Sequence, residues 1–336
     1  MRTKRFFLSD IHLGVGRSWD WFQPGQHEVP LLAALEYVAA DPATKDVVLL
    51  GDIFDTWVTP VDEVPPTVAE VVAAHPRVTA ALTACARSIE NVFFVAGNHD
   101  MGTTAFDLVD VTGVQVIERY HAGLLYAEHG HRFAMFNAPH KMQGGLDKLP
   151  LGYFVSRLMA GRDDYTAPGS LACYIDDALE TAFTTQRLAE SVIEGLMELT
   201  GHGPQTIVRM RAPRSDLTLA AVQQKYADLF TWWVQKFGYW YALRAVRAEL
   251  DSLEWFADRE ARQQGYRVVV MGHTHSVETD ADGPRRAPAR IYANTGSFCS
   301  GTPTLVEVDK ADGHYAVRLH AWDGHGRYVP GNPRTV

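Results

Sequence analysis

The chain has 336 residues, of which 46% are hydrophobic and 21% are charged, and its formal net charge is −9. This length corresponds to roughly two domains of about 150 residues, or to one large domain with a sizeable insertion. The ordinary hydrophobic fraction excludes an intrinsically disordered chain. The negative charge disfavours a protein that coats nucleic acid, because it repels phosphate polymers at long range. Fourteen histidines instead provide many ligands for a cation.

Cysteine usage and the lengths of the hydrophobic runs indicate where the protein resides. Three widely separated cysteines, Cys85, Cys173 and Cys299, form neither a disulfide framework nor a zinc cluster, so we expect buried thiols in a reducing compartment. The apolar residues before Ser9 are too few for a secretory signal. No run approaches the roughly 18 apolar residues that span a membrane. These features predict a cytoplasmic protein without a transmembrane segment.

The first part of the chain alternates short apolar runs with helical segments. The runs at residues 6–8, 47–50, 92–95 and 124–127 are continuously apolar, which is typical of strands buried on both faces of a sheet. Leucine and valine at helical spacing predict a helix over residues 29–40, and a second helical stretch covers residues 67–89. Strands and helices in alternation indicate an α/β layered fold.

Residues 140–264 have a different pattern, with apolar side chains at helical spacing over residues 175–196, 219–237 and 243–257. Gly201 ends the first of these stretches, and Gly238 separates the other two. We expect an insertion of about three long helices with no strand of its own.

Strand patterns return in the last part of the chain, at residues 268–271, 291–292, 304–308 and 315–319. The final residues, 323–336, are rich in glycine and proline, and we expect them to trail along the surface.

Side chains that can bind a metal directly follow five of the apolar runs. The five clusters are Asp10-Ile11-His12, Gly51-Asp52-Ile53-Phe54-Asp55, Gly97-Asn98-His99-Asp100, Glu128-His129-Gly130-His131 and Gly272-His273-Thr274-His275. The carboxyl ends of strands form the rim of the site in open α/β sheets, so clusters far apart in the sequence can converge. Taken singly, most of these motifs are more often turns or helix caps than ligands. Five of them in this order are difficult to assign to chance.

The chemistry of these clusters is consistent with a metal centre. Carboxylate oxygen, imidazole nitrogen and one amide oxygen suit Mn, Fe, Zn, Co or Ni. The absence of thiolates from the clusters argues against a structural zinc site. The ligands are too many for one ion and suit two ions that share a carboxylate, which is the arrangement that clamps both the attacking and the leaving oxygen in a phosphoryl displacement.

The ordered motifs resemble those of the calcineurin-like metallophosphoesterase superfamily, which are Asp-x-His, Gly-Asp-x-x-Asp, Gly-Asn-His-Asp/Glu, a lone His and Gly-His-x-His. All five are complete here, and residues 292–297 resemble the Asn-x-Gly-Ser turn of that family. The resemblance implies an α/β fold in which a β-sandwich of two mixed sheets is flanked by helices. The expected division is a core of residues 1–139 and 265–322, a helical insertion or cap of residues 140–264 and a C-terminal tail of residues 323–336.

The resemblance also implies two divalent ions, for which manganese is the first expectation. The ligands of one ion would be Asp10, His12, Asp52 and His275. The ligands of the other would be Asp52, Asn98, His129 and His273. His129 is chosen over His131 because the lone ligand of the family follows its strand directly and precedes a glycine. Asp55 is expected to orient a loop or a ligand.

The reaction implied by the resemblance is hydrolysis of a phosphomonoester or phosphodiester by a hydroxide that bridges the two ions. His99 is not a ligand in the family pattern. We expect it to contact the phosphate and to protonate the departing alkoxide, with Asp100 holding the ring and its tautomer. A catalytically silent metal-binding scaffold is an alternative of another class.

Part of the chain resembles the UDP-2,3-diacylglucosamine hydrolases, which cleave a pyrophosphate bond of a lipid precursor. The shared features are the opening Ser-Asp-Ile-His-Leu-Gly, the stretch Gly-Asp-Ile-Phe-Asp-Thr-Trp and a helical insertion before Gly-His-Thr-His. Two positions depart from that pattern, because His99 replaces an arginine and His131 replaces the Asp of His-Gly-Asp. The substrate is thus a small-molecule or a lipid-linked phosphate ester, with peripheral membrane contact as an option and no nucleic acid expected.

The insertion has many aromatic residues and several arginines. The aromatic side chains form either the core between its helices or a substrate pocket, and the adjacent Trp232 and Trp233 cannot share one helix face. Most of the arginines are expected at the surface, and no role is assigned to them. They are Arg157, Arg162, Arg209, Arg211 and Arg214.

Overall fold

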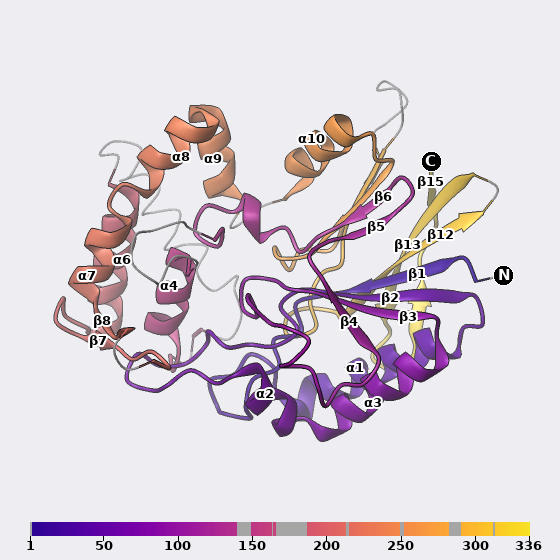
Figure 1. The fold of residues 1–336 in the computed structure, drawn as a ribbon, viewed down its shortest axis with the longest axis horizontal. Helices are drawn as coiled ribbons and strands as arrows, with labels where there is room; N and C mark the ends of the chain where they lie inside the picture. The colour runs from indigo at the N-terminus through magenta and orange to yellow at the C-terminus, as the bar shows by residue number, and fades with distance from the viewer. Residues whose placement is uncertain are drawn as a thin grey trace.

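Two β-sheets lie face to face in the computed structural model, with helices on both outer faces and a helical region at one end (Figure 1). The structure describes residues 2–139, 149–162, 164–165, 187–212, 215–248, 252–281, 290–311 and 313–336. Cys173, Arg214 and the first part of the helix expected over 175–196 lie outside these residues.

The larger sheet has eight strands in the order β14-β13-β12-β1-β2-β3-β4, and β15 also pairs with β13. The strands β1 to β4 are parallel, whereas β12 runs antiparallel to β1. Their bounds are β1 Lys4–Leu8, β2 Thr44–Leu50, β3 Asn91–Val95, β4 Val114–Ile117, β12 Thr304–Ala311, β13 His314–Trp322, β14 Tyr328–Pro330 and β15 Arg334–Thr335.

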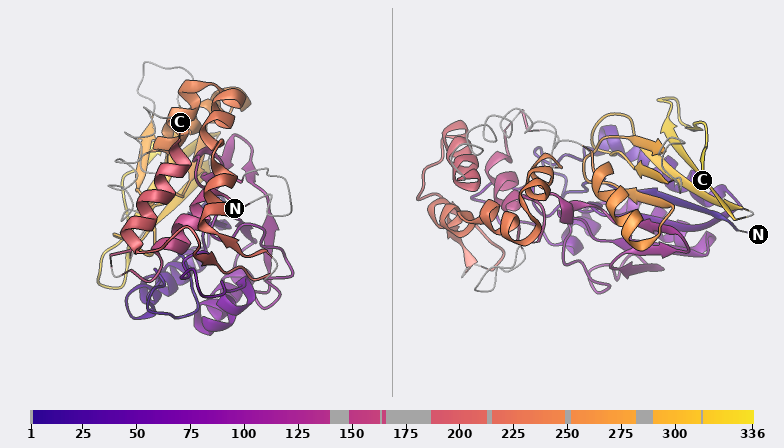
Figure 2. Two further views of the ribbon diagram at one scale, coloured as in Figure 1. Left: turned by 90° about the vertical axis from the view of Figure 1, so that its left-hand side faces the viewer. Right: turned by 90° about the horizontal axis from the view of Figure 1, so that it is seen from above.

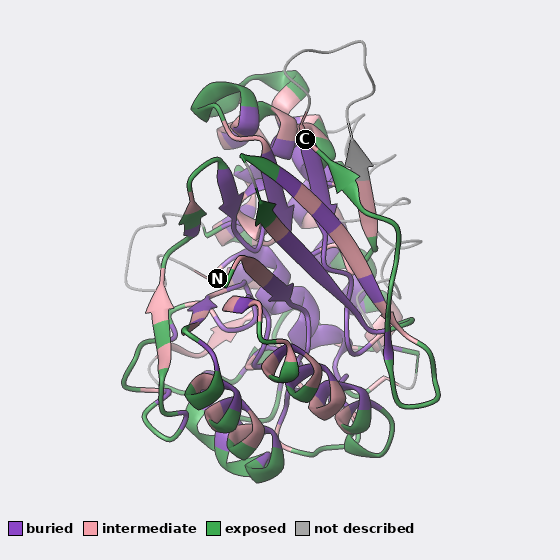
Figure 3. Ribbon diagram, turned by 90° about the vertical axis from the view of Figure 1, so that its right-hand side faces the viewer, coloured by how far each residue is buried: buried purple, intermediate pink, exposed green. Residues whose placement is uncertain are grey.

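The smaller sheet has five strands in the order β10-β11-β9-β6-β5, with β6, β9 and β11 parallel to one another. Their bounds are β5 Tyr120–Ala122, β6 Leu125–Ala127, β9 Val268–Met271, β10 Glu278–Ala281 and β11 Ile291–Asn294. Side chains from both inner faces, such as Phe7, Val48 and Val270, are fully buried between the sheets. Figure 3 shows the buried strands between helices whose outer faces are exposed. The predicted sandwich of two mixed sheets is confirmed.

Three helices cover the outer face of the larger sheet: α1 Pro24–Ala40, α2 Val68–Ala74 and α3 Pro76–Ser88. The single helical stretch expected over residues 67–89 is divided at His75, because the ring of Pro76 disfavours helical backbone at the residue before it. Helix α10, Glu254–Gln264, packs on β9 and β11 of the smaller sheet.

The helical region lies at one end of the sandwich, and the two termini lie at the other end (Figure 2). Its helices are α4 Leu151–Met159, α6 Leu188–Thr200, α7 Leu219–Tyr226, α8 Leu229–Phe237 and α9 Tyr239–Arg247. A short pair of strands, β7 Ile207–Val208 and β8 Leu217–Thr218, joins them. The expectation of about three long helices without strands is therefore corrected, since β7 and β8 are present and the stretches expected over 219–237 and 243–257 are each divided between two shorter helices.

The last residues of the chain extend the larger sheet, where a surface tail was expected. Strands β14 and β15 both pair with β13. The buried Tyr328 packs against Tyr37 and Trp322, and its hydroxyl donates a hydrogen bond of 3.1 Å to the carbonyl of Pro30. The division into core, insertion and tail stays a prediction.

Candidate metal centre

The predicted clusters meet at the end of the sandwich that faces the helical region. Strands β1, β2 and β3 are parallel, and so are β6 and β9, so their carboxyl ends bring the following loops together. Within the larger sheet, the amide of Asp10 donates to the carbonyl of Gly51 at 3.1 Å. Between the sheets, the amide of His273 donates to the carboxylate of Asp10 at 3.0 Å. The two sheets thus contribute to one site.

Four predicted ligands lie close together: Asp10, His12, Asp52 and His275. The Nε2 atom of His275 lies 3.2 Å from Asp10 Oδ1 and 3.1 Å from His12 Nε2. His12 Nε2 also lies 3.9 Å from Asp52 Oδ2. All four side chains are at most 8% exposed. This group matches the ligand set predicted for the first ion.

A second group shares Asp52 with the first. His129 Nε2 lies 3.1 Å from Asp52 Oδ2. Ligand atoms of Asp52, His129 and His273 all lie within 4.8 Å of one another, as do those of Asp10, His12 and Asp52. One carboxylate is therefore placed to serve both groups, as a bridging ligand would be.

Three buried ligand atoms in this cluster make no hydrogen bond: Asp10 Oδ1, Asn98 Oδ1 and His129 Nε2. The amide nitrogen of Asn98 donates to Asn137 Oδ1 at 3.2 Å, which leaves the amide oxygen as the free ligand atom. Buried polar atoms without partners are costly in a folded protein, and a cation would satisfy all three. The residues present therefore fit a divalent metal with mixed oxygen and nitrogen ligands.

The backbone of the ligand loops is held in an unfavourable conformation. Among the residues that the structure describes, five that are not glycine have a positive φ angle, between +51° and +74°. They are Asp10, His12, Asp52, His273 and His275. Each such residue costs on the order of 1–3 kcal/mol and persists only where the surrounding structure enforces it. All five are predicted ligands, so the strain coincides with the site.

The second ring nitrogen of three histidines is bound by a neighbour, which turns Nε2 towards the centre. His12 Nδ1 lies 3.1 Å from Asp55 Oδ2, and His129 Nδ1 lies 2.8 Å from the carbonyl oxygen of Leu50. His275 Nδ1 lies 3.2 Å from Ser300 Oγ. Metal-binding histidines usually have such a partner, because it fixes both the tautomer and the ring orientation.

His99 lies beside the ligand groups within a ring of aromatic side chains. Its imidazole stacks on Trp57, with ring centroids 4.6 Å apart and an angle of 28° between the planes, and Trp21 lies 5.3 Å away. His99 Nδ1 lies 3.1 Å from Asp55 Oδ2. Ligand atoms of His12, Asp55 and His99 also lie within 4.8 Å of one another, so the position of His99 alone does not separate a ligand from an acid.

The expectation that Asp100 holds the ring of His99 is corrected. The Asp100 carboxylate accepts backbone hydrogen bonds from Ile53 at 2.8 Å, Phe54 at 3.2 Å and Gly97 at 2.6 Å. These bonds fix the loop that carries Asp52. The carboxylate next to the His99 ring is that of Asp55, which also contacts His12.

Sequence reasoning missed three residues near the ligands. Trp21 and Trp57 flank His99. Trp57 ends the shared stretch Gly-Asp-Ile-Phe-Asp-Thr-Trp, which gave it no role, and no pattern distinguished Trp21 from a core residue. Cys299 lies with its sulfur 3.9 Å from His275 Nδ1. Asn294 also supports the site, because its side-chain amide donates to the carbonyl of Gly272 at 2.8 Å in the last ligand loop. The sequence signal for this residue was the resemblance to an Asn-x-Gly-Ser turn.

The aromatic residues of the insertion pack mainly with one another. Trp233 is buried and stacks on Tyr241, which packs against the buried Phe256. Trp232 is half-buried beneath Lys236, whose Nζ lies 4.5 Å from the ring centroid. These contacts agree with the expectation that the aromatic side chains form the core between the helices.

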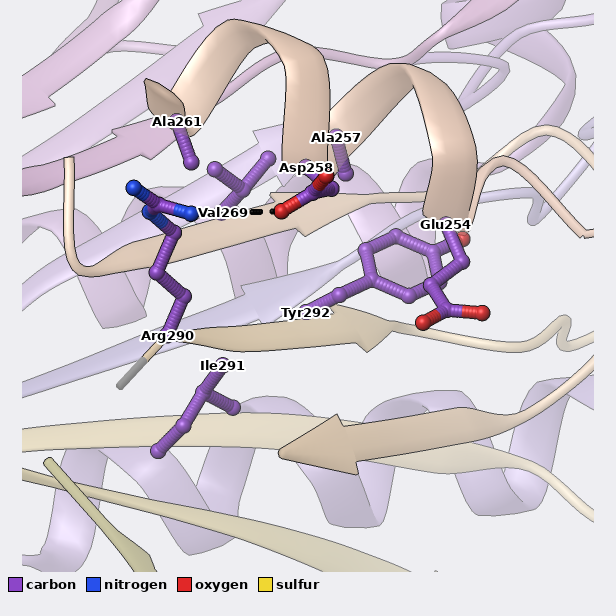
Figure 4. Close-up of a pocket in the computed structure, with 8 residues that line it drawn as sticks. All are labelled: Glu254, Ala257, Asp258, Ala261, Val269, Arg290, Ile291 and Tyr292. Atoms are coloured by element: carbon purple, nitrogen blue, oxygen red, sulfur yellow. Dashed lines mark hydrogen bonds and ion pairs between the residues drawn. The ribbon is translucent and has the colours of Figure 1, made fainter. Parts of the chain in front are cut away.

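A small cavity of about 20 Å³ lies between α10 and the outer face of β9 and β11 (Figure 4). Arg290 and Asp258 face each other across it, 3.3 Å apart, and Arg290 Nε is buried without a hydrogen-bond partner. A cavity of this size holds about one water molecule, so it does not qualify as a substrate site.

Metal binding is expected to weaken as the pH falls. Burial lowers the pKa of His129, but the carboxylates of Asp52 and Asp10 outweigh it and raise the pKa to about 9. The pKa of His275 is raised in the same way, mainly by Asp10, to about 10. Both rings hold a proton at neutral pH in the metal-free protein, and a metal must displace it. For each of these histidines, the apparent affinity for the metal falls about tenfold for every pH unit by which the pH lies below the pKa of the ring.

Calorimetry with Mn²⁺ at pH 6, 7 and 8, in buffers of different ionisation enthalpy, measures both the affinity and the protons released. An affinity that is independent of pH, with no proton release, would contradict this prediction.

Residues 4–277 match the sequence model of the calcineurin-like phosphoesterase family. This match covers most of the chain, so the protein belongs to that family of metal-dependent enzymes and relatives. No curated protein sequence matches the chain.

Several solved structures are similar to this one. Vacuolar protein sorting 29 from Cryptosporidium parvum is 10% identical, with a TM-score of 0.37 and coverage of 99% of this chain and 97% of that one. A conserved uncharacterised protein, described as a predicted phosphoesterase, from Streptococcus pneumoniae is 11% identical, with a TM-score of 0.33 and coverage of 99% and 97%. Phosphopantetheinyl hydrolase from Mycobacterium tuberculosis is 11% identical, with a TM-score of 0.33 and coverage of 88% and 91%.

Within the described part of the chain, no helix combines the length and the hydrophobicity needed to cross a membrane.

Proposed function

We propose that the protein is a phosphoesterase with two divalent ions, most naturally Mn²⁺, that hydrolyses a phosphomonoester or phosphodiester. The observation that carries the proposal is the position of Asp52 in both ligand groups, next to buried ligand atoms that make no hydrogen bond. Ions bound there supply water activation and neutralise the charge of the phosphate. The residues that would hold them are Asp10, His12, Asp52, Asn98, His129, His273 and His275.

His99 is proposed as the general acid that protonates the departing alkoxide. Burial lowers the pKa of His99, but Asp55 and Asp52 outweigh it and raise the pKa above its ordinary value, which favours the protonated ring. Because Nδ1 faces Asp55, the proton on Nε2 is the one available to the leaving group. The stacked Trp57 limits rotation of the ring.

An alkoxide leaving group suits this arrangement better than a pyrophosphate. Cleavage of a pyrophosphate expels a stable phosphate and needs less proton donation, whereas an alkoxide is a strong base that must be protonated. His99 stands where the lipid pyrophosphate hydrolases have an arginine, which favours the ester. The free, buried thiols of Cys85 and Cys299 support a cytoplasmic location, since they fit a reducing compartment.

The test is metal analysis of the purified protein followed by an activity screen of the Mn²⁺-loaded form on phosphomonoesters, phosphodiesters and pyrophosphates. We expect two bound ions and turnover of at least one ester class. Preferential cleavage of the pyrophosphates would favour the lipid pyrophosphate alternative. Two bound ions with no turnover of any compound would defeat the proposal and support a silent scaffold.

A further inference from the structure

Arg157 is fully buried, although the sequence pattern suggested a surface position. It lies in α4 of the helical region and donates hydrogen bonds to backbone carbonyl oxygens of the segment 59–63, which follows the second metal motif. Its bonds run to Thr59 at 2.5 Å, Pro60 at 2.8 Å, Val61 at 3.4 Å and Glu63 at 2.6 Å. All of its hydrogen-bond partners in the described structure are uncharged groups, so carbonyl dipoles stabilise the buried charge.

Two further bonds of Arg157 stay within the helical region. One guanidinium nitrogen donates to the carbonyl of Arg209 at 2.7 Å and to the hydroxyl of Tyr153 at 2.8 Å. The amide of Arg209 in turn donates to the carbonyl of Val61 at 2.7 Å. Arg157 therefore fastens a segment nearly 100 residues earlier in the sequence to the helical region, using every donor of its rigid fork.

The segment 59–63 begins two residues after Trp57, which contacts His99 together with Asp55. Asp55 Oδ1 accepts the amide hydrogens of Trp57 at 2.8 Å and Val58 at 2.9 Å, which fixes this carboxylate relative to the segment. The other oxygen of Asp55 lies 3.1 Å from His99 Nδ1. The carboxylate beside His99 is thus bonded to the two residues that directly precede the backbone that Arg157 holds.

A second path runs through aromatic rings. The ring of Tyr153, whose hydroxyl accepts from Arg157, meets the ring of Trp57 edge-on with centroids 5.7 Å apart. The ring of Trp57 in turn stacks on the imidazole of His99. Arg157 is therefore linked to His99 both through the backbone and through packed rings.

We propose that Arg157 is a positioning residue for His99, so that the helical region sets the geometry of proton donation in addition to any role in covering the site. This inference rests on the proposed function of His99 as the general acid. If it holds, loosening the segment 59–63 misplaces Asp55 and Trp57 and turns the imidazole away from the leaving group. None of the metal ligands is a hydrogen-bond partner of Arg157. The ligand that contacts Asp55 is His12, and its Nε2 also lies 3.9 Å from Asp52 and 3.1 Å from His275, so we expect the ligand groups to remain able to bind both ions.

The test compares Arg157→Met, which removes all donors, with Arg157→Lys, which keeps the charge but not the fork. A misplacement of about 1 Å can cost about 10²-fold in rate, so we expect kcat on an alkyl phosphate ester to fall by that order in Arg157→Met and by less in Arg157→Lys. Turnover of a nitrophenyl ester, which needs no proton donor, should change little, as should KM and metal content. Tyr153→Phe should give a smaller loss of the same kind.

Arg211→Met is the matched control. Arg211 also reaches from the helical region to the chain beyond the segment, donating to the carbonyl of Pro65 at 3.0 Å, but it is half-exposed and touches neither Asp55 nor Trp57. We expect no change in the ratio of alkyl to nitrophenyl turnover.

Two readouts separate this inference from a structural role. In a His99→Ala background, Arg157→Met should no longer change the ratio of the two turnovers, because the effect passes through His99. In the metal-free protein, the ¹⁵N-edited ring signals of His99, assigned by their loss in His99→Ala, should shift in Arg157→Met and not in Arg211→Met. Unchanged ring signals, equal loss on both esters, or loss of metal would overturn the positioning role.

Failure of the proposed function gives a different result. If His99→Ala itself leaves the ratio of the two turnovers unchanged, His99 is not the acid, whatever the ring signals of the Arg157 variants show. Should Arg157→Met not fold, Arg157→Lys and Tyr153→Phe decide the question by the same ratio and the same ring signals.

Discussion

Replacing Asp52 with asparagine is expected to reduce the bound metal to one ion or none and to abolish phosphoesterase turnover. Asp52 is the carboxylate common to both ligand groups, and no other described residue belongs to both in the proposed ligand set. Under the two-ion proposal, the substitution would remove a negative charge from between the two cations. Metal polarisation of a phosphate is worth several kcal/mol of barrier, so kcat should fall by about 10³-fold or more.

Asparagine is the substitution that isolates this charge. Asp52 has a φ angle of +51°, and asparagine tolerates this backbone region better than most residues. Its amide oxygen can still accept the 2.8 Å hydrogen bond from the amide of His99. The fold should therefore persist, as circular dichroism and thermal melting would show.

The half-buried Asp107, which caps the loop after the third motif by accepting from Thr104, provides the control variant Asp107→Asn. It should retain both ions and full turnover. Two tightly bound ions in Asp52→Asn, measured by inductively coupled plasma mass spectrometry, would show that Asp52 does not bridge.

The convergence of the proposed ligands was predictable because each lies at the end of a continuously apolar run. A run of that kind identifies a strand buried on both faces, and parallel strands bring their carboxyl ends to one edge. The contact of Asp55 with His99 and the role of Asp100 were not predictable in the same way. Both follow a strand within a few residues, but their partners depend on the path of the loop, which places Asp100 under backbone amides and Asp55 beside His99.

Helical spacing identified the apolar faces of the insertion but not the ends of its helices. The spacing continues across the junction between α7 and α8, because Tyr226 and Phe230 keep the same face on either side of Ala227 and Asp228. Burial of Arg157 could not be read from the sequence either. An arginine in an amphipathic helix normally points to water. The cost of burying the charge of Arg157 is offset by hydrogen bonds to carbonyl groups of a segment distant in sequence, which no local pattern reveals.

Replacing His99 with alanine is expected to leave both ions bound and to slow the hydrolysis of alkyl phosphate esters far more than that of nitrophenyl esters. General acid catalysis contributes about 10²–10⁴-fold where the leaving group must be protonated, and this is the loss expected with the alkyl ester. Nitrophenolate leaves without a proton, so its ester should lose little. Measuring kcat for both esters and the metal content of the same sample provides the test.

The exposed His121, which lies 3.1 Å from the hydroxyl of Tyr266, provides the control variant His121→Ala, and neither ester should be affected. Two outcomes would contradict the assignment. Equal losses on both esters would mean that His99 binds the phosphate without donating a proton. Loss of an ion would mean that His99 joins His12 and Asp55 as a ligand, the arrangement that their proximity also permits. The geometry at His99 alone supports both a general acid and a metal ligand. The ratio of alkyl to nitrophenyl turnover, measured together with the metal content, therefore separates these two roles.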